Sequence, residues 1–154
     1  GADPVAVSGN LDPVVPPDCR GPQFRDPGGW GIVEFSGGVK GYVHAAAEAT
    51  APIRVCIVGS EGHMTVRRDE AWVDLWTGER RAIPVQTDRP TSLDMAVADL
   101  VDCLTRGSQP ACTGEDGRAA LEVTIGFHVS DRLNGAWVPL PITGDDRDYE
   151  VLIG

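Results

Sequence analysis

The stretch that most restricts the fold of this chain runs from residue 30 to residue 86, where short apolar segments alternate with turn signals. We predict strands over 30–35, 39–47, 51–60, 63–68, 71–77 and 80–86, and another over 3–9. The turn Ser36-Gly37-Gly38 and its later counterparts are too short to hold a helical crossover. Consecutive strands joined in this way run antiparallel. The pattern therefore predicts an antiparallel meander.

Both faces of this predicted sheet carry apolar or aromatic groups. Alternation along 71–77 separates the two faces clearly. In 53–58 the residues that point to one face and those that point to the other are both largely apolar. One face is expected to pack on helices and the other on a second copy of the chain, because a monomer with such a face would expose an unusually large apolar patch. The residues assigned to this oligomer face are Tyr42, His44, Cys56 and Val58.

Two helices follow the strands. The first is predicted over 91–107, with Thr91 as its N-cap and a stop at Gly107, and the second over 113–135, with Thr113 as its N-cap and a stop at Gly135. The apolar stripe of the first helix comprises Leu93, Val97, Leu100, Val101 and Leu104. Residues 136–142 read as an edge strand, because Pro139 and Pro141 cannot donate to a central ladder. Strands followed by two helices predict an α+β fold: one open, mostly antiparallel sheet with helices on one face, in a single domain over 1–154.

Charge and cysteine usage narrow the function classes. The net charge of −10 argues against a nucleic-acid or anionic-membrane surface, since both require clustered Lys and Arg. No apolar run approaches the ~18 residues that span a bilayer, and no signal peptide is visible. The four cysteines, with irregular spacing and no paired motif, are expected to be reduced thiols of a cytoplasmic protein; they are Cys19, Cys56, Cys103 and Cys112.

No self-contained catalytic or metal motif is present in the sequence. The glycines of 35–41 lie between two strands with no helix after them, so they form a hairpin turn and not a phosphate cradle. Asp145, Asp146 and Asp148 lack the glycine and terminal Glu of a calcium loop and are read as a solvated acidic tail. His128 on a helix face is read as a packed, half-buried residue rather than a catalytic one.

Several segments in order resemble one family of enzymes. They are "GWGIVEFSGGVKGYV", "IRVCIVGSEGHMTV" and "MAVADLVDCLTRGSQPACTGEDGRAALEVTIGFHVSDRLNGAWVPLPI". In this order and spacing they resemble the C-terminal half of the Gfo/Idh/MocA family, the glucose–fructose oxidoreductases and inositol dehydrogenases. The resemblance covers about residues 1–142, with the hairpin glycines Gly37 and Gly38, the turn glycines Gly59 and Gly62, and Ser130 at motif positions.

The resemblance implies a substrate-side and oligomerisation domain of an NAD(P)-dependent oxidoreductase acting on a sugar, cyclitol or related polyol. In the family an N-terminal Rossmann domain holds the NAD or NADP, and the C-terminal domain forms homodimers or homotetramers through its sheet face. The glycine fingerprint, the catalytic lysine segment and the acid/base helix would all precede Gly1. This chain is therefore expected to bind no cofactor and to be inert by itself.

Two interpretations of the missing half stay open. In one, the chain is an excised domain of such an enzyme. In the other, it is a naturally truncated homologue that acts as a small binding protein or as an enzyme of unrelated chemistry. The DNA upstream of the codon for Gly1 distinguishes them, because only the first predicts an open frame that encodes a Rossmann motif.

The resemblance also places the substrate contacts that this chain could supply on the loop at 16–30, within and just after the proline-rich stretch of 10–29. Donors for sugar hydroxyls or a carboxylate could come from Arg20, Gln23 and Arg25, and Trp30 could offer a flat face to a ring. The alternatives are that the arginines form exposed salt bridges with neighbouring aspartates, and that the loop is an arm packed on a neighbouring subunit.

Overall fold

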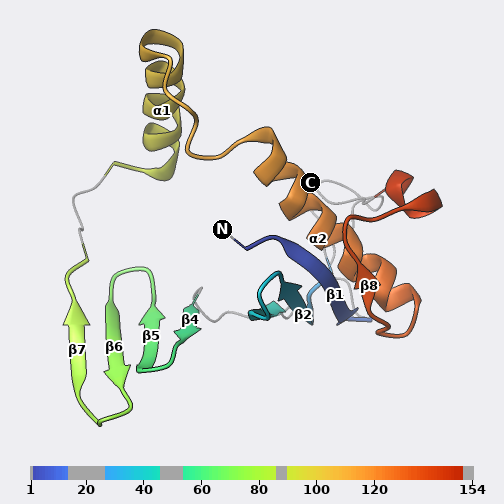
Figure 1. The fold of residues 1–154 in the computed structure, drawn as a ribbon, viewed down its shortest axis with the longest axis horizontal. Helices are drawn as coiled ribbons and strands as arrows, with labels where there is room; N and C mark the ends of the chain where they lie inside the picture. Colours follow the sequence, from blue (N-terminus) through green and yellow to red (C-terminus); the bar gives the residue numbers. More distant parts are fainter. Residues whose placement is uncertain (1, 14–26, 46–53, 86–89, 151–154) are drawn as a thin grey trace. The chain divides into compact units, whose positions relative to one another are not determined.

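A computed structural model describes residues 2–13, 27–45, 54–85 and 90–150. The strands are β1 (Pro4–Leu11), β2 (Gly29–Phe35), β3 (Lys40–Ala45), β4 (Val55–Val58), β5 (Gly62–Val66), β6 (Ala71–Leu75), β7 (Arg80–Ile83) and β8 (Val138–Pro139). The helices are α1 (Ser92–Arg106) and α2 (Gly114–Arg132), with a 3-10 helix over Gly144–Asp148. Figure 1 shows their path.

The strands form two antiparallel sheets of four strands each. The first sheet has the order β3-β2-β1-β8 and the second sheet the order β4-β5-β6-β7. The chain divides accordingly into two compact units, Gly1–Ala49 with Cys112–Gly154, and Thr50–Ala111. The predicted α+β class and antiparallel strands are confirmed, but the strands do not follow one another in a single meander. In the sequence, residues 46–52 consist mostly of Ala, Glu and Pro, which are poor strand formers, and the parts of the predicted strands that fall on 46–47 and 51–53 lie outside the described residues.

In the first unit, α2 packs on one face of the first sheet (Figure 1). The core is small and consists of Val7, Val33, Val129 and Val138, with Phe127 and Leu140 packed against it. Glycines let the helix approach the strands closely. A Cβ on Gly31 would lie 2.2 Å from the Phe127 ring, and one on Gly126 would lie 2.5 Å from Val7. Gly9 is the cross-strand partner of Gly31, so the ring rests on two paired glycines.

Polar contacts fix α2 on β1. The buried Ser130 hydroxyl accepts from the Gly9 N–H at 3.0 Å and donates to the Ala136 carbonyl at 2.7 Å. The carboxylate of the next residue, Asp131, accepts from the Leu11 N–H at 3.0 Å. These contacts satisfy strand donors that the sheet leaves free, and they set the position of the helix along β1.

Both predicted helix starts are confirmed. Thr91 and Thr113 each accept from the backbone of the Asp three residues later, and that Asp accepts from the Thr backbone, so both helices begin with a capping box. Gly107 ends α1 in the left-handed conformation, as predicted. The second helix ends at Arg132, with Asn134 and Gly135 at positive φ just beyond. None of the described helices has the length and apolar character needed to cross a bilayer.

The predicted edge strand is also confirmed. β8 forms the edge of the first sheet, where Val138 pairs with Val7 and Pro139 with Ala6. It is shorter than the predicted 136–142.

Candidate functional site

The predicted site residues fall into three groups. Arg20, Gln23 and Arg25 lie outside the described residues. Trp30 lies in β2, and Tyr42 and His44 lie in β3. Cys56 and Val58 lie in β4 of the second sheet. The sequence treats Trp30 as a substrate residue and the other four as one oligomer face, whereas the structure groups Trp30 with Tyr42 and His44.

These three aromatic residues share the open face of the first sheet. Gly31 and Val33 face α2, so alternation along β2 turns Trp30 and Ile32 to the opposite side. Trp30 pairs with His44, and Ile32 pairs with Tyr42. Trp30 is 52% exposed and Tyr42 is 80% exposed. We call Trp30, Ile32, Tyr42 and His44 the aromatic face.

On the other side, a small cavity of about 150 Å³ lies between α2 and the ends of β1, β2 and β3. Its walls are mostly apolar and include Leu11, Val43 and Phe127, while Thr124 and His128 bring polar side chains. Trp30, which the sequence analysis assigns to substrate, also contributes to the lining. The Thr124 hydroxyl donates to the Ala120 carbonyl at 3.2 Å. The His128 ring is half-buried and lies 5.7 Å from the ring of Tyr149, which agrees with a packing role. The cavity could hold one small apolar group, and its lining contains no nucleophile paired with a base.

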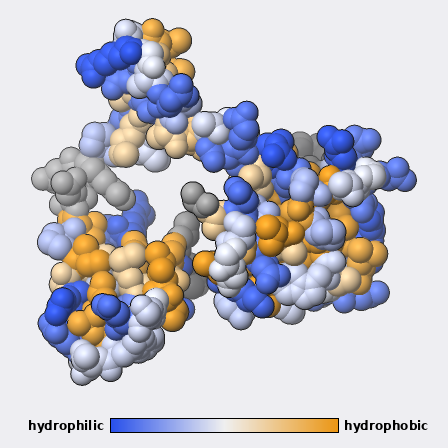
Figure 2. Space-filling model, viewed as in Figure 1, coloured by the Kyte–Doolittle hydropathy of each residue, from blue (hydrophilic) through white to orange (hydrophobic). Residues whose placement is uncertain are grey.

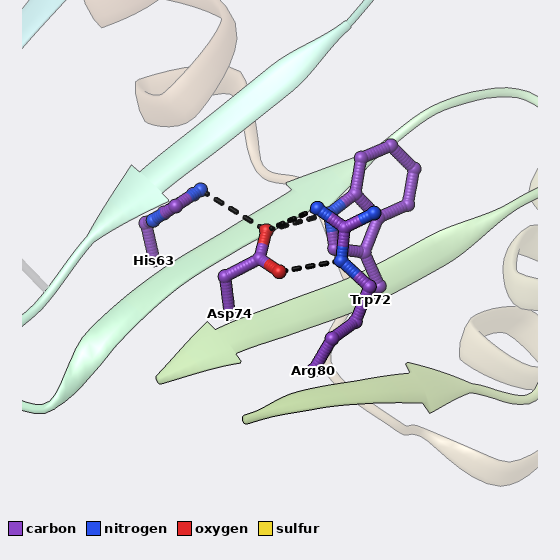
Figure 3. Close-up of polar contacts among 4 residues, drawn as sticks. All are labelled: His63, Trp72, Asp74 and Arg80. Carbon is purple, nitrogen blue, oxygen red and sulfur yellow. Dashed lines mark hydrogen bonds and ion pairs between the residues drawn. The ribbon is translucent and has the colours of Figure 1, made fainter. Parts of the chain in front are cut away.

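The second sheet carries a cluster of polar and aromatic side chains on one face (Figure 3). Asp74 of β6 is its centre. It accepts from Trp72 Nε1 at 2.8 Å and from both Nε and a terminal nitrogen of Arg80 on β7. His63 Nε2 on β5 lies 3.2 Å from the same carboxylate. The cluster therefore joins three neighbouring strands.

Cation–π contacts and ring packing extend this cluster. The guanidinium carbons of Arg67 and Arg80 lie 5.2 Å and 5.1 Å from the Trp72 ring. The His63 ring lies 5.5 Å from that of Trp76. The hydrogen bond and charge of Arg80, helped by the Trp72 indole, hold the pKa of Asp74 below its ordinary value of 3.8. We call His63, Trp72, Asp74, Trp76 and Arg80 the Asp74 cluster.

The register of the second sheet places Cys56 and Val58 on the same face as this cluster. Val58 pairs with His63, and Cys56 pairs with Thr65. Thr65 in turn pairs with Trp72. Within the Asp74 cluster the charged side chains pair with one another. The sequence alone indicates only the alternation of Trp72, Asp74 and Trp76.

The described residues show no arrangement specific to metal or redox chemistry. No group of three or more His, Cys, Asp or Glu side chains in the described ranges could hold a metal ion. Cys56, Cys103 and Cys112 are free thiols. In the acidic segment, Asp146 accepts from Arg132 at 2.6 Å.

Comparison with solved structures gives the clearest relationship. The aldose-aldose oxidoreductase from Caulobacter crescentus matches with a TM-score of 0.70 and 20% identity, over 91% of this chain and 42% of that enzyme. The UDP-N-acetylglucosamine 3-dehydrogenase from Acidithiobacillus ferrooxidans matches with a TM-score of 0.70 and 16% identity, over 84% and 41% of the two chains. An inositol dehydrogenase homologue from Azotobacter vinelandii, solved with NADH and myo-inositol, matches with a TM-score of 0.60 and 13% identity, over 90% and 44%.

These matches show a shared fold. The sequence identities are too low to show a shared activity or substrate. This chain spans about two fifths of the length of each of these proteins. No family model matches the sequence, and no curated protein matches it significantly.

Proposed function

We propose that this chain is the substrate-side and oligomerisation domain of an NAD(P)-dependent oxidoreductase of the Gfo/Idh/MocA type, acting on a sugar, cyclitol or related polyol. The observation that carries the proposal is the shared fold with three sugar or inositol oxidoreductases, each of which is more than twice as long as the matching part. The segments quoted from the sequence support the same family. NAD or NADP would be bound by a Rossmann domain of the parent protein.

The aromatic face supports a role in contacts with other molecules. Trp30 offers a flat, half-exposed ring, and exposed Tyr42 and the imidazole of His44 lie on the same surface. Aromatic groups of this kind contact sugar rings or a second protein surface. We propose that the chain forms a homodimer or homotetramer through the face of the first sheet away from α2, together with the face of the second sheet that holds Cys56 and Val58.

Two experiments test this function. Sequencing the DNA upstream of the codon for Gly1 is expected to find an open frame that encodes a Rossmann motif, and a start codon with a ribosome site directly before Gly1 contradicts the proposal. Calorimetry of this chain with the oxidised and reduced forms of NAD and NADP is expected to show no binding, because no Gly-rich turn opens a helix in the sequence. Micromolar binding of any of the four would also contradict it.

Sedimentation tests the oligomer separately. We expect a dimer or larger species at micromolar concentration, with Tyr42→Ser and Val58→Ser shifting it toward the monomer. A Glu115→Gln variant, on the exposed start of α2, serves as the control. A monomer of about 16 kDa that is unchanged on concentration would refute the oligomer while leaving the enzyme family untouched.

A further inference from the structure

The cavity of the first unit has a floor made by two cross-strand rows on the side of the sheet that faces α2. One row is Leu11, Gly29 and Ala45, and the other contains Gly31 and Val43. Because the two glycines have no side chain and Ala45 has only a methyl group, a hollow is left between these rows and the helix. Val43 is 45% exposed and Ala45 is exposed, so the hollow opens over β3.

The backbone around this cavity is already engaged in hydrogen bonds. β2 is an inner strand, so its N–H and C=O groups pair with β1 on one side and with β3 on the other. The Gly28 carbonyl accepts from the Asp12 N–H at 2.8 Å, and the Thr124 hydroxyl donates its proton to the Ala120 carbonyl. A ligand that buried several hydroxyl groups against these walls would leave most of them without partners, which is unfavourable. The lining therefore favours an apolar group.

One stripe of α2 gives the cavity a polar side. Thr124 and His128 both line it, and they lie one turn apart on the helix. The His128 ring packs against Tyr149 at 5.7 Å, and Tyr149 in turn lies 5.9 Å from the guanidinium carbon of Arg132, which pairs with Asp146 at 2.6 Å. The segment after β8 thus helps to fix His128 in this wall. A ligand with one polar end can reach this stripe while its apolar part occupies the rest of the cavity.

We propose that this cavity is a binding site for a small amphipathic molecule that has a benzene-sized apolar part and a single polar end. A cavity of about 150 Å³ with apolar walls is large enough to hold benzene. Mostly apolar walls with a few polar groups are the usual composition of small-molecule sites. A protein partner fits less well, because each side of a stable interface buries roughly 800 Å², whereas this cavity admits a single side chain. The site does not depend on the proposed function.

Amide shifts in proton–nitrogen NMR spectra of the full chain test this site, with benzyl alcohol as the probe and myo-inositol as the polyhydroxy control. Benzyl alcohol is expected to shift the amides of Gly31, Val43 and Thr124 in a saturable way, and myo-inositol at the same concentration should leave them unchanged. Mapping by residue is needed because α1 also presents hydrophobic atoms along one side (Figure 2), where Leu104 is 78% exposed.

Two substitutions that fill the cavity complete the test. Val43→Phe and Ala45→Leu are each expected to abolish the saturable shifts, and circular dichroism checks that each variant folds. Ala45 is exposed, so its variant keeps the test decisive if Val43→Phe does not fold. Val39→Phe is the matched control, because Val39 precedes β3 in the same hairpin, is 61% exposed and is not part of the lining.

Four outcomes would overturn the proposal. They are shifts confined to α1, saturable shifts that persist in a filled variant, shifts of the lining amides by myo-inositol, and no shift of these amides up to the solubility limit of benzyl alcohol. The tests of the proposed function use the upstream DNA and the nicotinamide cofactors, so either proposal can fail while the other stands.

Discussion

The Phe127 ring of α2 lies against Gly31 of β2, and no Cβ fits between them. Gly9, the cross-strand partner of Gly31, makes the same kind of contact with the ring, since a Cβ there would lie 2.9 Å from it. The helix approaches the first sheet at the place where two paired residues lack side chains. The position of α2, and with it the cavity beside His128, depends on this pair.

Gly31→Ala is therefore expected to destabilise the first unit by about 1–3 kcal/mol, the cost of overpacking a well-filled contact. Gly117→Ala is the matched control, because its Cβ would meet nothing within 4 Å and the change should stabilise the helix by about 0.5–1 kcal/mol. Urea denaturation gives both values. Equal stability of the Gly31→Ala variant and the parent would show that the ring moves aside at no cost.

Ser130→Ala tests the polar link between α2 and β1. The change removes the acceptor of the Gly9 N–H and the donor to the Ala136 carbonyl in a fully buried position. With the Gly9 N–H and the Ala136 carbonyl left unpaired, the free energy of unfolding is expected to fall by about 1–3 kcal/mol, and amide exchange at Gly9 is expected to become faster. Thr105→Ala, which removes an exposed hydroxyl bond within α1, should change stability by less than about 0.5 kcal/mol. Unchanged protection of the Gly9 amide would refute the link.

The capping boxes predict a pH dependence. Hydrogen bonds from the backbone and side chain of Thr113 hold the pKa of Asp116 below its ordinary value of 3.8. A carboxyl with a lowered folded-state pKa stabilises the fold fully above the unfolded value, and this contribution disappears as the pH falls through the folded pKa. Asp116→Ala should lower Tm at pH 7 and make little difference at pH 2. A Tm difference that persists unchanged at pH 2 would contradict this cause.

Asp74→Asn tests the polar cluster of the second sheet. The variant removes the charge that faces Arg80 and His63, and it is expected to loosen β5, β6 and β7 together. Hydrogen exchange of these strands should speed up, and the fluorescence of the neighbouring Trp72 and Trp76 should change. Glu79→Gln breaks the exposed pair with Arg81 and is the control, with little expected effect because exposed ion pairs contribute little. If both variants behave alike, Asp74 is no more than a surface charge.

Local patterns predicted the elements well, while the contacts between elements could not be predicted from them. Thr91, Thr113 and Gly107 have local roles that a few neighbouring residues determine, and the structure confirms all three. The contact of Phe127 with Gly9 and Gly31 joins residues more than 90 positions apart, so no local pattern indicates it. The same holds for His63 and Asp74, which meet only because the register of β5 and β6 pairs them.

The grouping of the site residues shows the same limit. Alternation alone indicates that Trp30 lies on one side of its strand, but the register with β3 is needed to place it beside His44. Arg20, Gln23 and Arg25 lie outside the described residues, so their assignment to substrate stays a prediction. The oligomer role of Tyr42, His44, Cys56 and Val58 likewise stays a prediction. The first two of these residues lie in the first sheet and the last two in the second sheet.

Pro139 in β8 has a consequence for how this protein can misassemble. A sheet edge with free N–H groups can accept a strand from another molecule and so begin edge-to-edge aggregation. At the β8 edge the strand is two residues long and one of them has no N–H, so little template is available there. The opposite edge, β3, has six residues without a proline, and Lys40 at its start is the charged residue that discourages such pairing. Replacement of Lys40 by an apolar residue would remove this protection from the more vulnerable side of the first sheet.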